Sequence, residues 1–385
     1  MTAGLKGKKR VAFVVESGTD VRLVRGLHEA FHLTVFARRI PGGVAISQPF
    51  SEIEVVKAGP GRLGFALAAF IWLVRRERFD GILVQGYGLA ALAINLFSIF
   101  TGAKVYQLVC SPTELYYLRR KDVEDANFPF HARFYFLIKL LARLNALFRS
   151  HYVVLSQHLA ELVESHGVGR HRISKIPLYG IDLDRFTPSA EPKEKIRQRL
   201  GLPKEVCLVF FGSRIAPEKD VACLLSATKI LLEESYPIVL LNLSGGYAEF
   251  LELATSMGVR DHVLAYNAVH PTEGLSDYYR ACDVFVQSSR EEGLGFAVLE
   301  AMACDVPVVA AHVGGLKETV VDGVTGWSYK AGHAQDLAAK IESVIACDEW
   351  TRASALANAR ENVSLNYESH SAFLRLRELI ESQST

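Results

Sequence analysis

The sequence of 385 residues has little of what marks the special classes of protein. Its six cysteines form no C-x-x-C pair and no Cys/His pattern, which argues against a zinc site or a disulfide framework and indicates reduced thiols in a cytoplasmic protein. Charged residues make up 22% of the chain and hydrophobic residues 50%, and no repeat or biased tract occurs. These values favour a globular protein of two to three domains over a disordered, fibrous or low-complexity one.

Long hydrophobic runs are also missing. The basic N-terminus is followed by an apolar run, Val11–Val15, that is too short for the core of a signal peptide. The stretch Gly81–Ala103 is uncharged and long enough to span a membrane, but Gln85, Asn95 and several glycines interrupt it. We therefore interpret it as a buried strand, a glycine-rich turn and a buried helix.

The overall charge of +1 conceals an asymmetry between the two halves of the chain. Up to Gly180 there are 24 Lys and Arg against 13 Asp and Glu, and after it 19 against 29. The basic first half suggests contact with an anionic partner, such as a membrane surface or a phosphorylated substrate. Attraction between two domains of opposite charge is the alternative.

Short apolar runs alternate with helical patterns along the whole chain, which predicts parallel sheets with crossover helices. In the first half the expected strands are Val11–Glu16, Leu33–Ala37, Ile53–Val56, Ile82–Gln85, Val105–Cys110 and Tyr152–Ser156. In the second half they are Cys207–Phe211, Ile238–Leu243, Val263–Ala265, Val284–Gln287 and Val308–Ala310. A proline-bracketed stretch, Leu178–Leu202, is interpreted as a linker followed by a short charged helix. Two doubly wound domains are predicted, with ligands at the carboxyl ends of their strands.

Two segments of the first half combine apolar and basic residues. Ala126–Ala160 contains no acidic residue, and its four Lys and Arg are interleaved with aromatic residues and leucines. Leu63–Val74 is apolar and is followed by Arg75, Arg76 and Arg78. Either segment fits an interfacial helix or a core helix with a solvated basic edge.

The segment Arg290–Ala310, which follows the expected strand Val284–Gln287, is the most informative part of the sequence. A glycine-containing loop that opens a helix presents unpaired backbone N–H groups and a positive dipole end, which suit a phosphate. Glu292 lies in this loop and Glu300 in the helix, about 12 Å away if the whole segment were helical. The two carboxylates could contact opposite ends of one extended ligand.

Four ordered motifs carry a resemblance to a known family. They are Glu292-x7-Glu300, the segment Gly212–Lys219 with its G-x-R…K pattern, Gly314-Gly315-x-x-Glu318, and the linker Gly180–Pro188. In this order and spacing the sequence resembles the family 4 retaining glycosyltransferases of the GT-B fold.

The resemblance implies roles for the motif residues. Arg214 and Lys219 would neutralise a leaving diphosphate, which two fixed cations can do; a surface salt bridge with Glu218 or Asp220 is the alternative. The remaining implied donor contacts are the amides of Leu294, Gly295 and Phe296 to the distal phosphate, Glu292 to the donor sugar, Glu300 to the ribose hydroxyls, Val269 to the base, and Gly18 to the donor phosphate.

The first half departs from the family pattern. Many members carry a glycine pair after the first strand, where this chain has only Gly18. Many also carry a histidine after the fifth strand, where Cys110 and Ser111 stand here. We expect other groups, Ser111 and Glu114 among them, to hold the acceptor, or catalysis to depend on the donor side.

Asp182-Leu-Asp184 is formally a metal-binding Asp-x-Asp pair, but no other carboxylate cluster lies near it in the sequence. We therefore expect no metal. No G-x-G-x-x-G follows the first strand, which argues against a dinucleotide-dependent enzyme.

We predict an α/β protein of the GT-B fold, with two doubly wound Rossmann-like domains facing across a cleft. Residues 1–180 would bind the acceptor, residues 181–365 would bind the sugar nucleotide, and a C-terminal helix in residues 366–385 would cross back to the first domain. The predicted activity is retaining, metal-independent transfer of a sugar from a nucleotide diphosphate sugar to a glycan, lipid-linked or other hydroxyl acceptor in cell-surface polysaccharide or glycolipid synthesis, with no cofactor.

The expected partners are the nucleotide-sugar donor, a hydroxyl acceptor and an anionic membrane surface, on which a cytoplasmic protein would sit peripherally; nucleic acid is not expected. Two alternatives remain open. One is transfer to a soluble sugar phosphate, and the other is a catalytically silent homologue that binds nucleotide or a partner.

Overall fold

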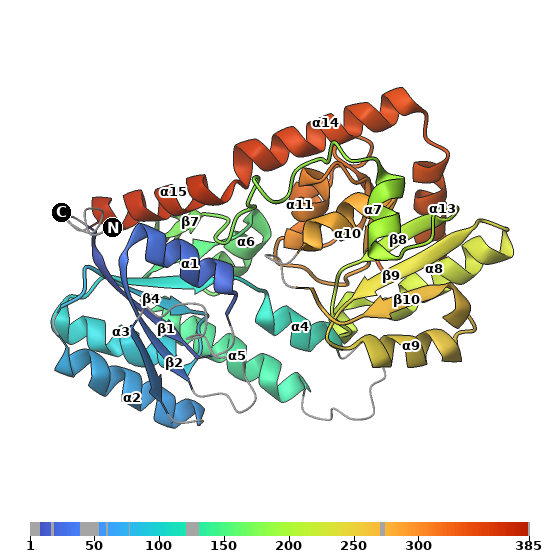
Figure 1. Ribbon diagram of the computed structural model, residues 1–385. Coiled ribbons are helices and arrows are strands. Elements are labelled where there is room, and N and C mark those ends of the chain that lie inside the picture. Colours follow the sequence, from blue (N-terminus) through green and yellow to red (C-terminus); the bar gives the residue numbers. More distant parts are fainter. Residues whose placement is uncertain are drawn as a thin grey trace. The chain divides into compact units, whose positions relative to one another are not determined.

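The computed structural model describes residues 8–16, 19–38, 54–58, 61–76, 78–120, 131–269 and 274–383. They divide into two compact units (Figure 1). Unit 1 contains the described residues up to Leu118, those from His131 to Gly180, and the segment from Ser369 onward. Unit 2 contains Ile181–Glu368 and the last two residues of the helix Thr113–Arg120.

Unit 1 is built on a seven-stranded sheet in the order β3-β2-β1-β4-β5-β6-β7, in which every neighbouring pair is parallel. Its strands are β1 (Arg10–Val15), β2 (His32–Arg38), β3 (Glu54–Ala58), β4 (Gly81–Gln85), β5 (Val105–Val109), β6 (His151–Val154) and β7 (Ile173–Lys175). Its helices are α1 (Val21–Ala30), α2 (Arg62–Arg75), α3 (Leu89–Thr101), α4 (Thr113–Arg120), α5 (His131–Ala146), α6 (Gln157–Ser165) and α15 (Ser369–Ser382).

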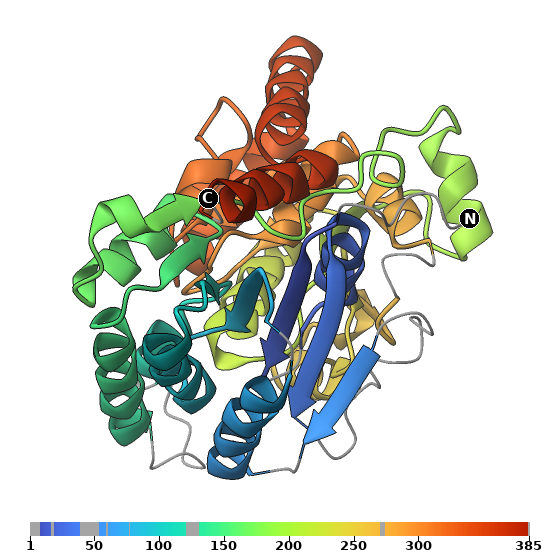
Figure 2. The same ribbon diagram turned by 90° about the vertical axis from the view of Figure 1, so that its left-hand side faces the viewer.

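The helices of unit 1 cover both faces of its sheet. α2, α3 and α5 lie side by side over one face, and α1 and α15 cover the other (Figure 1 and Figure 2). The central strands are buried except for Arg10 at the start of β1 and Gln85 at the end of β4, because helices on both faces leave no polar side to a parallel sheet. α1 and α15 approach so closely that a Cβ atom on Gly26 would lie 2.0 Å from the ring of Phe373.

A buried imidazole joins the edge of this sheet to the C-terminal segment. Nε2 of His151 lies 2.9 Å from the hydroxyl of Ser174, and its Nδ1 lies 3.0 Å from the amide nitrogen of Gln383. Burial, together with the charges of Arg172 and His171, lowers the pKa of His151 to about 4. The ring is therefore neutral at physiological pH.

Unit 2 is built on a six-stranded parallel sheet in the order β10-β9-β8-β11-β12-β13. Its strands are β8 (Cys207–Phe211), β9 (Ile238–Leu243), β10 (Val263–Tyr266), β11 (Val284–Gln287), β12 (Val308–Ala311) and β13 (Trp327–Tyr329). Its helices are α7 (Lys193–Leu200), α8 (Val221–Glu233), α9 (Tyr247–Ser256), α10 (Leu275–Ala281), α11 (Phe296–Ala303), α12 (Leu316–Thr319), α13 (Ala334–Ile345) and α14 (Glu349–Asn366).

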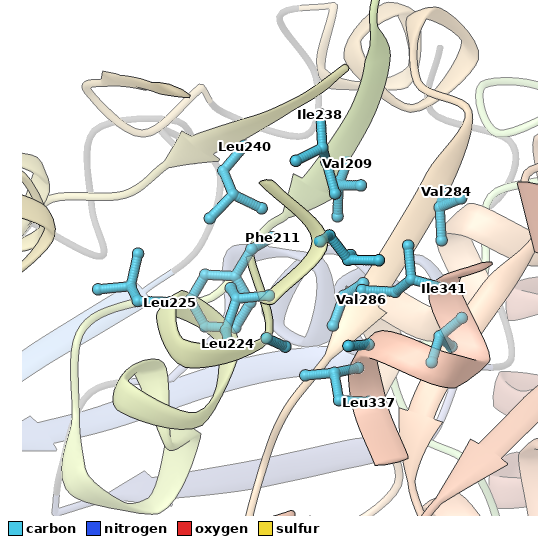
Figure 3. Packing of buried hydrophobic residues seen from close by; sticks show 14 of the residues in the cluster. Val209, Phe211, Leu224, Leu225, Ile238, Leu240, Val284, Val286, Leu337 and Ile341 are labelled. Carbon is cyan, nitrogen blue, oxygen red and sulfur yellow. The ribbon is translucent and has the colours of Figure 1, made fainter. Parts of the chain in front are cut away.

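The core of unit 2 lies between the sheet and the helices α8 and α13. Val209 and Phe211 of β8 pack with Leu224 of α8 and Leu337 of α13, and all four side chains are buried (Figure 3). Because β8 and β11 are central, this packing fixes the positions at which their carboxyl ends leave the sheet.

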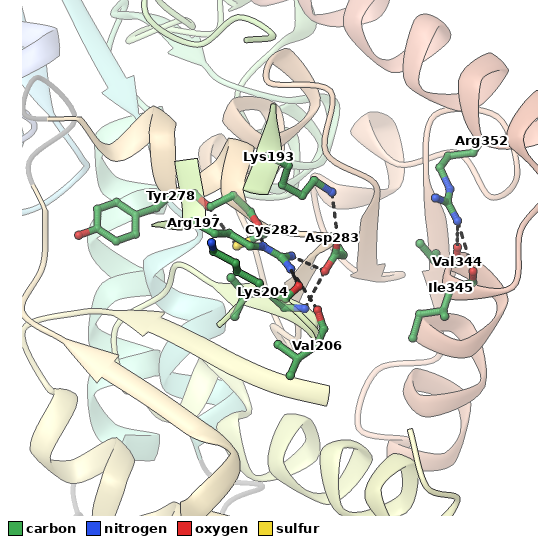
Figure 4. Close-up of polar contacts among 12 residues, drawn as sticks. Lys193, Arg197, Lys204, Val206, Tyr278, Cys282, Asp283, Val344, Ile345 and Arg352 are labelled. Atoms are coloured by element: carbon green, nitrogen blue, oxygen red, sulfur yellow. Dashed lines mark hydrogen bonds and ion pairs between the residues drawn. The ribbon is translucent and has the colours of Figure 1, made fainter. Parts of the chain in front are cut away.

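A buried arginine attaches the linker helix α7 to the amino ends of the central strands β8 and β11. The guanidinium of Arg197 donates to the carbonyl of Ala281 at 2.8 Å and to the carboxylate of Asp283 at 2.5 Å, and Lys193 pairs with the other oxygen of Asp283 at 2.9 Å (Figure 4). Burial raises the pKa of Asp283, but the charge of Lys193 and hydrogen bonds, including those from Lys193, Arg197 and the backbone of Leu208, outweigh it and lower that pKa.

The α/β class predicted from the sequence is confirmed, and so is the interpretation of Gly81–Ala103 as strand, turn and helix. Among the described residues, no helix has both the length and the apolar character needed to cross a membrane. Two strands, β7 and β13, were not expected. Each has three residues and lies at a sheet edge, which is too short to produce a recognisable pattern.

Candidate functional site

The strand order of unit 2 defines where a ligand can enter its sheet. β8 and β11 are neighbours, but the chain leaves β8 toward β9 and leaves β11 toward β12. The loops that follow these two strands therefore diverge at the carboxyl ends of the strands, which is the usual ligand site of a doubly wound sheet. The loop after β8 carries Arg214 and Lys219, and the loop after β11 carries Glu292.

Lys219 and Glu292 meet between these two loops. The Nζ atom of Lys219 lies 2.5 Å from Oε2 of Glu292, and each side chain is 13% exposed. Lys219 is held by the short 3-10 turn Pro217–Lys219, and the hydroxyl of Ser288 donates to its backbone carbonyl at 2.7 Å. The pair is thus a largely desolvated charge pair at the point where the two loops part.

Neutral polar side chains form a hydrogen-bonded network next to the Lys219–Glu292 pair. Gln287, the last residue of β11, is buried and donates to the hydroxyls of Ser213 at 3.1 Å and Ser289 at 2.7 Å. Ser289 in turn donates to Oε2 of Glu292 at 3.2 Å. The sequence reasoning missed Gln287, Ser213 and Ser289, although a glutamine that ends an otherwise apolar strand is a usable signal.

Arg214 does not join this pair. Its side chain is 63% exposed and donates to Oε1 of the fully buried Glu218 at 2.7 Å. This contact is the salt bridge that the sequence left open as the alternative. Arg290, in the loop after β11, pairs with Asp220, at the end of the loop after β8, at 2.9 Å.

The start of α11 has the form expected of an anion site. Gly295 is its N-cap residue, with φ of 92°, and the helix begins at Phe296. The amides of Leu294, Gly295 and Phe296 therefore lie at the positive end of the helix dipole. Because only the last part of Glu292–Glu300 is helical, the separation expected for a fully helical segment does not apply.

The pair Gly314-Gly315 brings the loop after β12 into backbone contact with the glutamate loop. The amide of Gly315 donates to the carbonyl of Glu292 at 2.9 Å. A Cβ atom on Gly314, where φ is 46°, would lie 2.1 Å from that carbonyl oxygen. Only glycine fits such an approach, so this motif positions Glu292 rather than a ligand directly.

Glu300 is buried in the interior of unit 2. It is 4% exposed, and its Oε2 accepts a hydrogen bond from the hydroxyl of Tyr279 of α10 at 2.7 Å. The ring of Tyr279 packs edge-on against Phe210 of β8. Tyr279, which orients this carboxylate from a different helix, was not predicted from the sequence.

Two further residues, Val269 and Gly18, were predicted to contact the base and a phosphate of the donor. Val269 is half-buried and lies three residues after the end of β10. Gly18 lies outside the described residues.

The sheet of unit 1 has its own switch point, between β1 and β4. A pocket of about 430 Å³ opens there. Its polar lining includes Glu16, Arg38, Arg62 and Ser111, and α5 supplies an apolar wall. Arg38 donates to the backbone carbonyl of Glu16 at 2.7 Å, and Arg62 lies 3.6 Å from the Glu16 carboxylate.

The two predicted acceptor residues occupy different places. Ser111 lines the pocket, and its hydroxyl lies 3.0 Å from that of Thr113. Glu114 is buried instead: it accepts from the hydroxyl of Tyr87 at 2.8 Å and lies 2.7 Å from Nε2 of His166. Glu114 is therefore not a lining residue of the pocket, but it contacts Tyr87, which is one.

His166 was not predicted from the sequence as a partner of Glu114. It lies 52 residues from Glu114 in the chain, at the end of α6, so no spacing could associate the two. Burial and the charge of Glu114 raise the pKa of Tyr87 well above its ordinary value, so Tyr87 remains a hydrogen-bond donor. Cys110, at the position of the family's histidine, has its pKa raised to about 11 by burial.

Within the part of the chain that the structure describes, no group of three or more His, Cys, Asp or Glu side chains is arranged to hold a metal ion. In the Asp182-x-Asp184 segment, Oδ1 of Asp182 accepts from the backbone amide of Asp184 at 3.2 Å and Oδ2 accepts from Arg185 at 2.9 Å. This carboxylate is engaged in its own turn.

The sequence and the fold of unit 2 agree with those of a known class of enzymes. Residues 192–362 match the model of the family described as "Glycosyl transferases group 1". The matched segment contains Arg214, Lys219, Glu292 and Glu300. The match supports the assignment of this part of the chain to the glycosyltransferases.

Curated relatives carry names of the same class. A D-inositol 3-phosphate glycosyltransferase of Xylanimonas cellulosilytica is 38% identical over 52% of this chain and 49% of its own. A GDP-mannose-dependent alpha-(1-6)-phosphatidylinositol monomannoside mannosyltransferase of Mycolicibacterium smegmatis is 34% identical over 52% and 54%. The chain thus spans about half the length of the curated relatives it matches.

Solved structures resemble the whole chain. HepE of Anabaena, crystallised with UDP, aligns over 97% of this chain and 100% of its own with a TM-score of 0.77 and 20% identity. Sucrose-phosphate synthase of Thermosynechococcus elongatus aligns over 97% and 99% with a TM-score of 0.79 and 20% identity. These similarities confirm the predicted GT-B fold.

Proposed function

We propose that the protein is a retaining, metal-independent glycosyltransferase that moves a sugar from a nucleotide diphosphate sugar to a hydroxyl acceptor. The observation that carries this proposal is the Lys219–Glu292 pair at the switch point of unit 2, next to the amides that open α11. A cation, a carboxylate and a helix N-terminus close together are what a diphosphate and a sugar require.

The donor would be held from several sides. Lys219 and Arg214 would neutralise the diphosphate, for which the side chain of Arg214 would turn away from Glu218. Because that side chain is exposed, it has room to turn. The distal phosphate would be bound by the amides of Leu294, Gly295 and Phe296. Further contacts proposed from the family resemblance are Glu300 to the ribose hydroxyls, Val269 to the base and Gly18 to the donor phosphate.

Transfer would occur on the face of the sugar from which the diphosphate leaves. The acceptor oxygen attacks the anomeric carbon, the bond from that carbon to the diphosphate oxygen breaks, and a diphosphate oxygen takes the proton of the acceptor hydroxyl. Glu292 would orient the sugar and stabilise positive charge at the anomeric carbon. Removing one such charge costs roughly 3–4 kcal/mol of barrier, so Lys219→Ala should lower turnover about a hundredfold or more.

The acceptor is proposed to carry a phosphate beside its hydroxyl and to bind in the pocket of unit 1. Arg38 and Arg62 supply the cations, and the names of the relatives, which act on an inositol phosphate or a phosphatidylinositol mannoside, agree with such an acceptor. The apolar wall from α5 favours a lipid-linked acceptor in cell-surface polysaccharide or glycolipid synthesis, reached by a cytoplasmic protein at the inner face of the membrane. A soluble sugar phosphate remains the alternative, because the two arginines suit it equally.

The first experiment is calorimetric titration with UDP-, GDP- and ADP-sugars. We expect one strong binder, weakened at least tenfold by Glu300→Gln. Glutamine is preferred to alanine because it leaves an acceptor for the hydroxyl of Tyr279. Glu252→Gln, an exposed carboxylate on α9, is the matched control.

Absence of binding by every sugar nucleotide would refute the proposal and leave a silent homologue. Slow hydrolysis of the bound sugar nucleotide without acceptor would separate an enzyme from a protein that only binds. Unchanged binding in Glu300→Gln would remove Glu300 from the donor site.

A further inference from the structure

The outer face of α2 is apolar although its inner face already packs on the sheet. Phe65, Ala69 and Leu73 are buried, at intervals of four residues. The outward positions Leu63, Leu67, Ile71 and Val74 follow helical spacing along the opposite side and are 40% to 73% exposed. A helix covering a sheet normally shows polar residues outward, so this stripe requires an explanation.

The two neighbouring helices extend the same surface. On α3 the exposed apolar residues are Leu96, Ile99 and Phe100, and on α5 and directly after it they are Phe136, Leu137, Leu140 and Leu147. α2, α3 and α5 lie side by side on one face of the sheet (Figure 1). Eleven large apolar side chains, each at least 40% exposed, therefore share one layer, far beyond the scattered exposure that is ordinary.

The charge of this layer has one sign. Residues 62–75, 89–101 and 131–146 contain no Asp and no Glu, whereas they contain Arg62, Arg75, Lys139 and Arg143 among their basic residues. Apolar helices whose own charged residues are all cations are complementary to an anionic bilayer, whose headgroups attract the cations while its acyl region accepts the apolar side chains.

We infer that the outward residues of α2, α3 and α5 form a docking face for an anionic lipid membrane. The face enters the interfacial region with its apolar side chains and holds the headgroups with the arginines and lysines at its border. No helix spans the bilayer in this arrangement, which agrees with the absence of a membrane-spanning helix among the described residues.

The docking face is continuous with the pocket of unit 1. Phe134, Leu137 and Ile138 of α5 and Arg62 of α2 line that pocket, and Leu137 also belongs to the face. An acceptor lipid could therefore place its phosphate beside Arg62 while its tail remains in the bilayer. This last step rests on the proposed function, whereas docking itself does not.

Co-sedimentation of the full chain with vesicles tests the inference. Vesicles of phosphatidylcholine alone are compared with vesicles that also contain phosphatidylglycerol, at low and at high salt. Ile99→Ser/Phe100→Ser and Leu63→Ser/Leu67→Ser remove apolar side chains of the face, and Trp350→Ser/Leu365→Ser removes two equally exposed ones from α14 of unit 2 as the control.

We expect binding to the acidic vesicles only, weakened at least tenfold by either face variant and unaffected by the control. High salt should weaken binding several-fold, because the border charges are exposed. Thermal unfolding should be unchanged in all three variants, since each side chain removed is on the surface.

Three outcomes would overturn the inference. The first is a wild-type protein that does not bind acidic vesicles, and the second is face variants that bind them as well as the wild type does. The third is a lipid-free dimer that Ile99→Ser/Phe100→Ser converts to a monomer, because the face would then be an interface between two copies of the chain. Sugar-nucleotide binding, measured without vesicles, separates the two proposals. If the wild-type protein bound a sugar nucleotide but no vesicles, docking alone would be refuted. If it bound acidic vesicles but no sugar nucleotide, the proposed function alone would be refuted.

Discussion

Because of the short contact between Lys219 and Glu292, the proposed donor would compete with the protein's own carboxylate for the amine of Lys219. The amine of Lys219 is 2.5 Å from Glu292, so a diphosphate can bind Lys219 only by weakening this contact. Glu292→Gln removes the competing charge and keeps the shape of the side chain. We therefore expect opposite effects of this substitution on nucleoside diphosphate binding and on turnover.

The structure sets the size of the effect. A hydrogen bond between charged groups contributes about 1.5–3 kcal/mol, which corresponds to roughly 10- to 100-fold in affinity. Part of this gain is offset, because a glutamine oxygen still accepts weakly from Lys219. We expect the nucleoside diphosphate to bind Glu292→Gln about tenfold more tightly, and Lys219→Met, which loses the cation, about tenfold or more weakly.

Calorimetric titration of both variants and of the double variant measures these differences. Turnover of the sugar nucleotide should fall about a hundredfold in Glu292→Gln in spite of the tighter product binding. The double variant should bind like Lys219→Met, because the competition no longer exists. If Glu292→Gln weakened diphosphate binding as much as Lys219→Met does, the pair would be a structural ion pair and the reasoning would be wrong.

Three further substitutions or conditions test the surrounding structure. Gly314→Ala would place Cβ 2.1 Å from the carbonyl of Glu292 and should weaken sugar-nucleotide binding several-fold and lower the melting temperature, as calorimetry would show. Gly26→Ala would press against the ring of Phe373 and should destabilise the protein by about 1–3 kcal/mol in thermal unfolding, with partial recovery in Gly26→Ala/Phe373→Leu. His151 has a pKa lowered to about 4 in the folded protein, so the stability it contributes is present above pH 6.5 and is lost as the pH falls toward 4; melting temperatures of wild type should decline more over this range than those of His151→Gln.

The fold could be predicted because it rests on patterns that lie within single segments. Cys207–Phe211, Ile238–Leu243 and Val284–Gln287 are predicted with their observed bounds, since each is a continuous apolar run ended by a polar or glycine-rich turn. The three-residue edge strands β7 and β13 have no such pattern. They form because a neighbouring strand offers hydrogen bonds, which is information from outside the segment.

The proposed donor site could be predicted only in its loops. The motif indicates that Glu292, Leu294 and Gly295 act together, because they follow one strand and open one helix. It does not indicate Gln287 beneath Glu292 or Tyr279 beside Glu300. Those contacts depend on how separate elements pack, and the same motif could be supported by other polar residues.

The two residues predicted to hold the acceptor show more clearly that a role cannot be assigned from sequence position alone. Ser111 and Glu114 follow β5 within a few residues, yet one lines the pocket and the other is turned into the interior. The reason is His166, which gives the buried carboxylate of Glu114 a partner from a remote part of the chain. Without that partner a buried carboxylate would be too costly to desolvate, and the side chain would be expected to face the pocket.

The charge asymmetry of the sequence predicts different salt sensitivities for the two proposed ligand sites. Arg62 in the pocket of unit 1 has a side chain that is 64% exposed, so its interaction with a phosphate is screened at moderate ionic strength. Lys219 is 13% exposed and acts beside backbone amides, so its interaction is screened much less. The inorganic phosphate binding that Arg62→Gln removes should therefore fall several-fold between low and high salt, while the affinity for the nucleoside diphosphate changes less. Equal salt dependence of the two would mean that the excess positive charge of the first half does not act through this pocket.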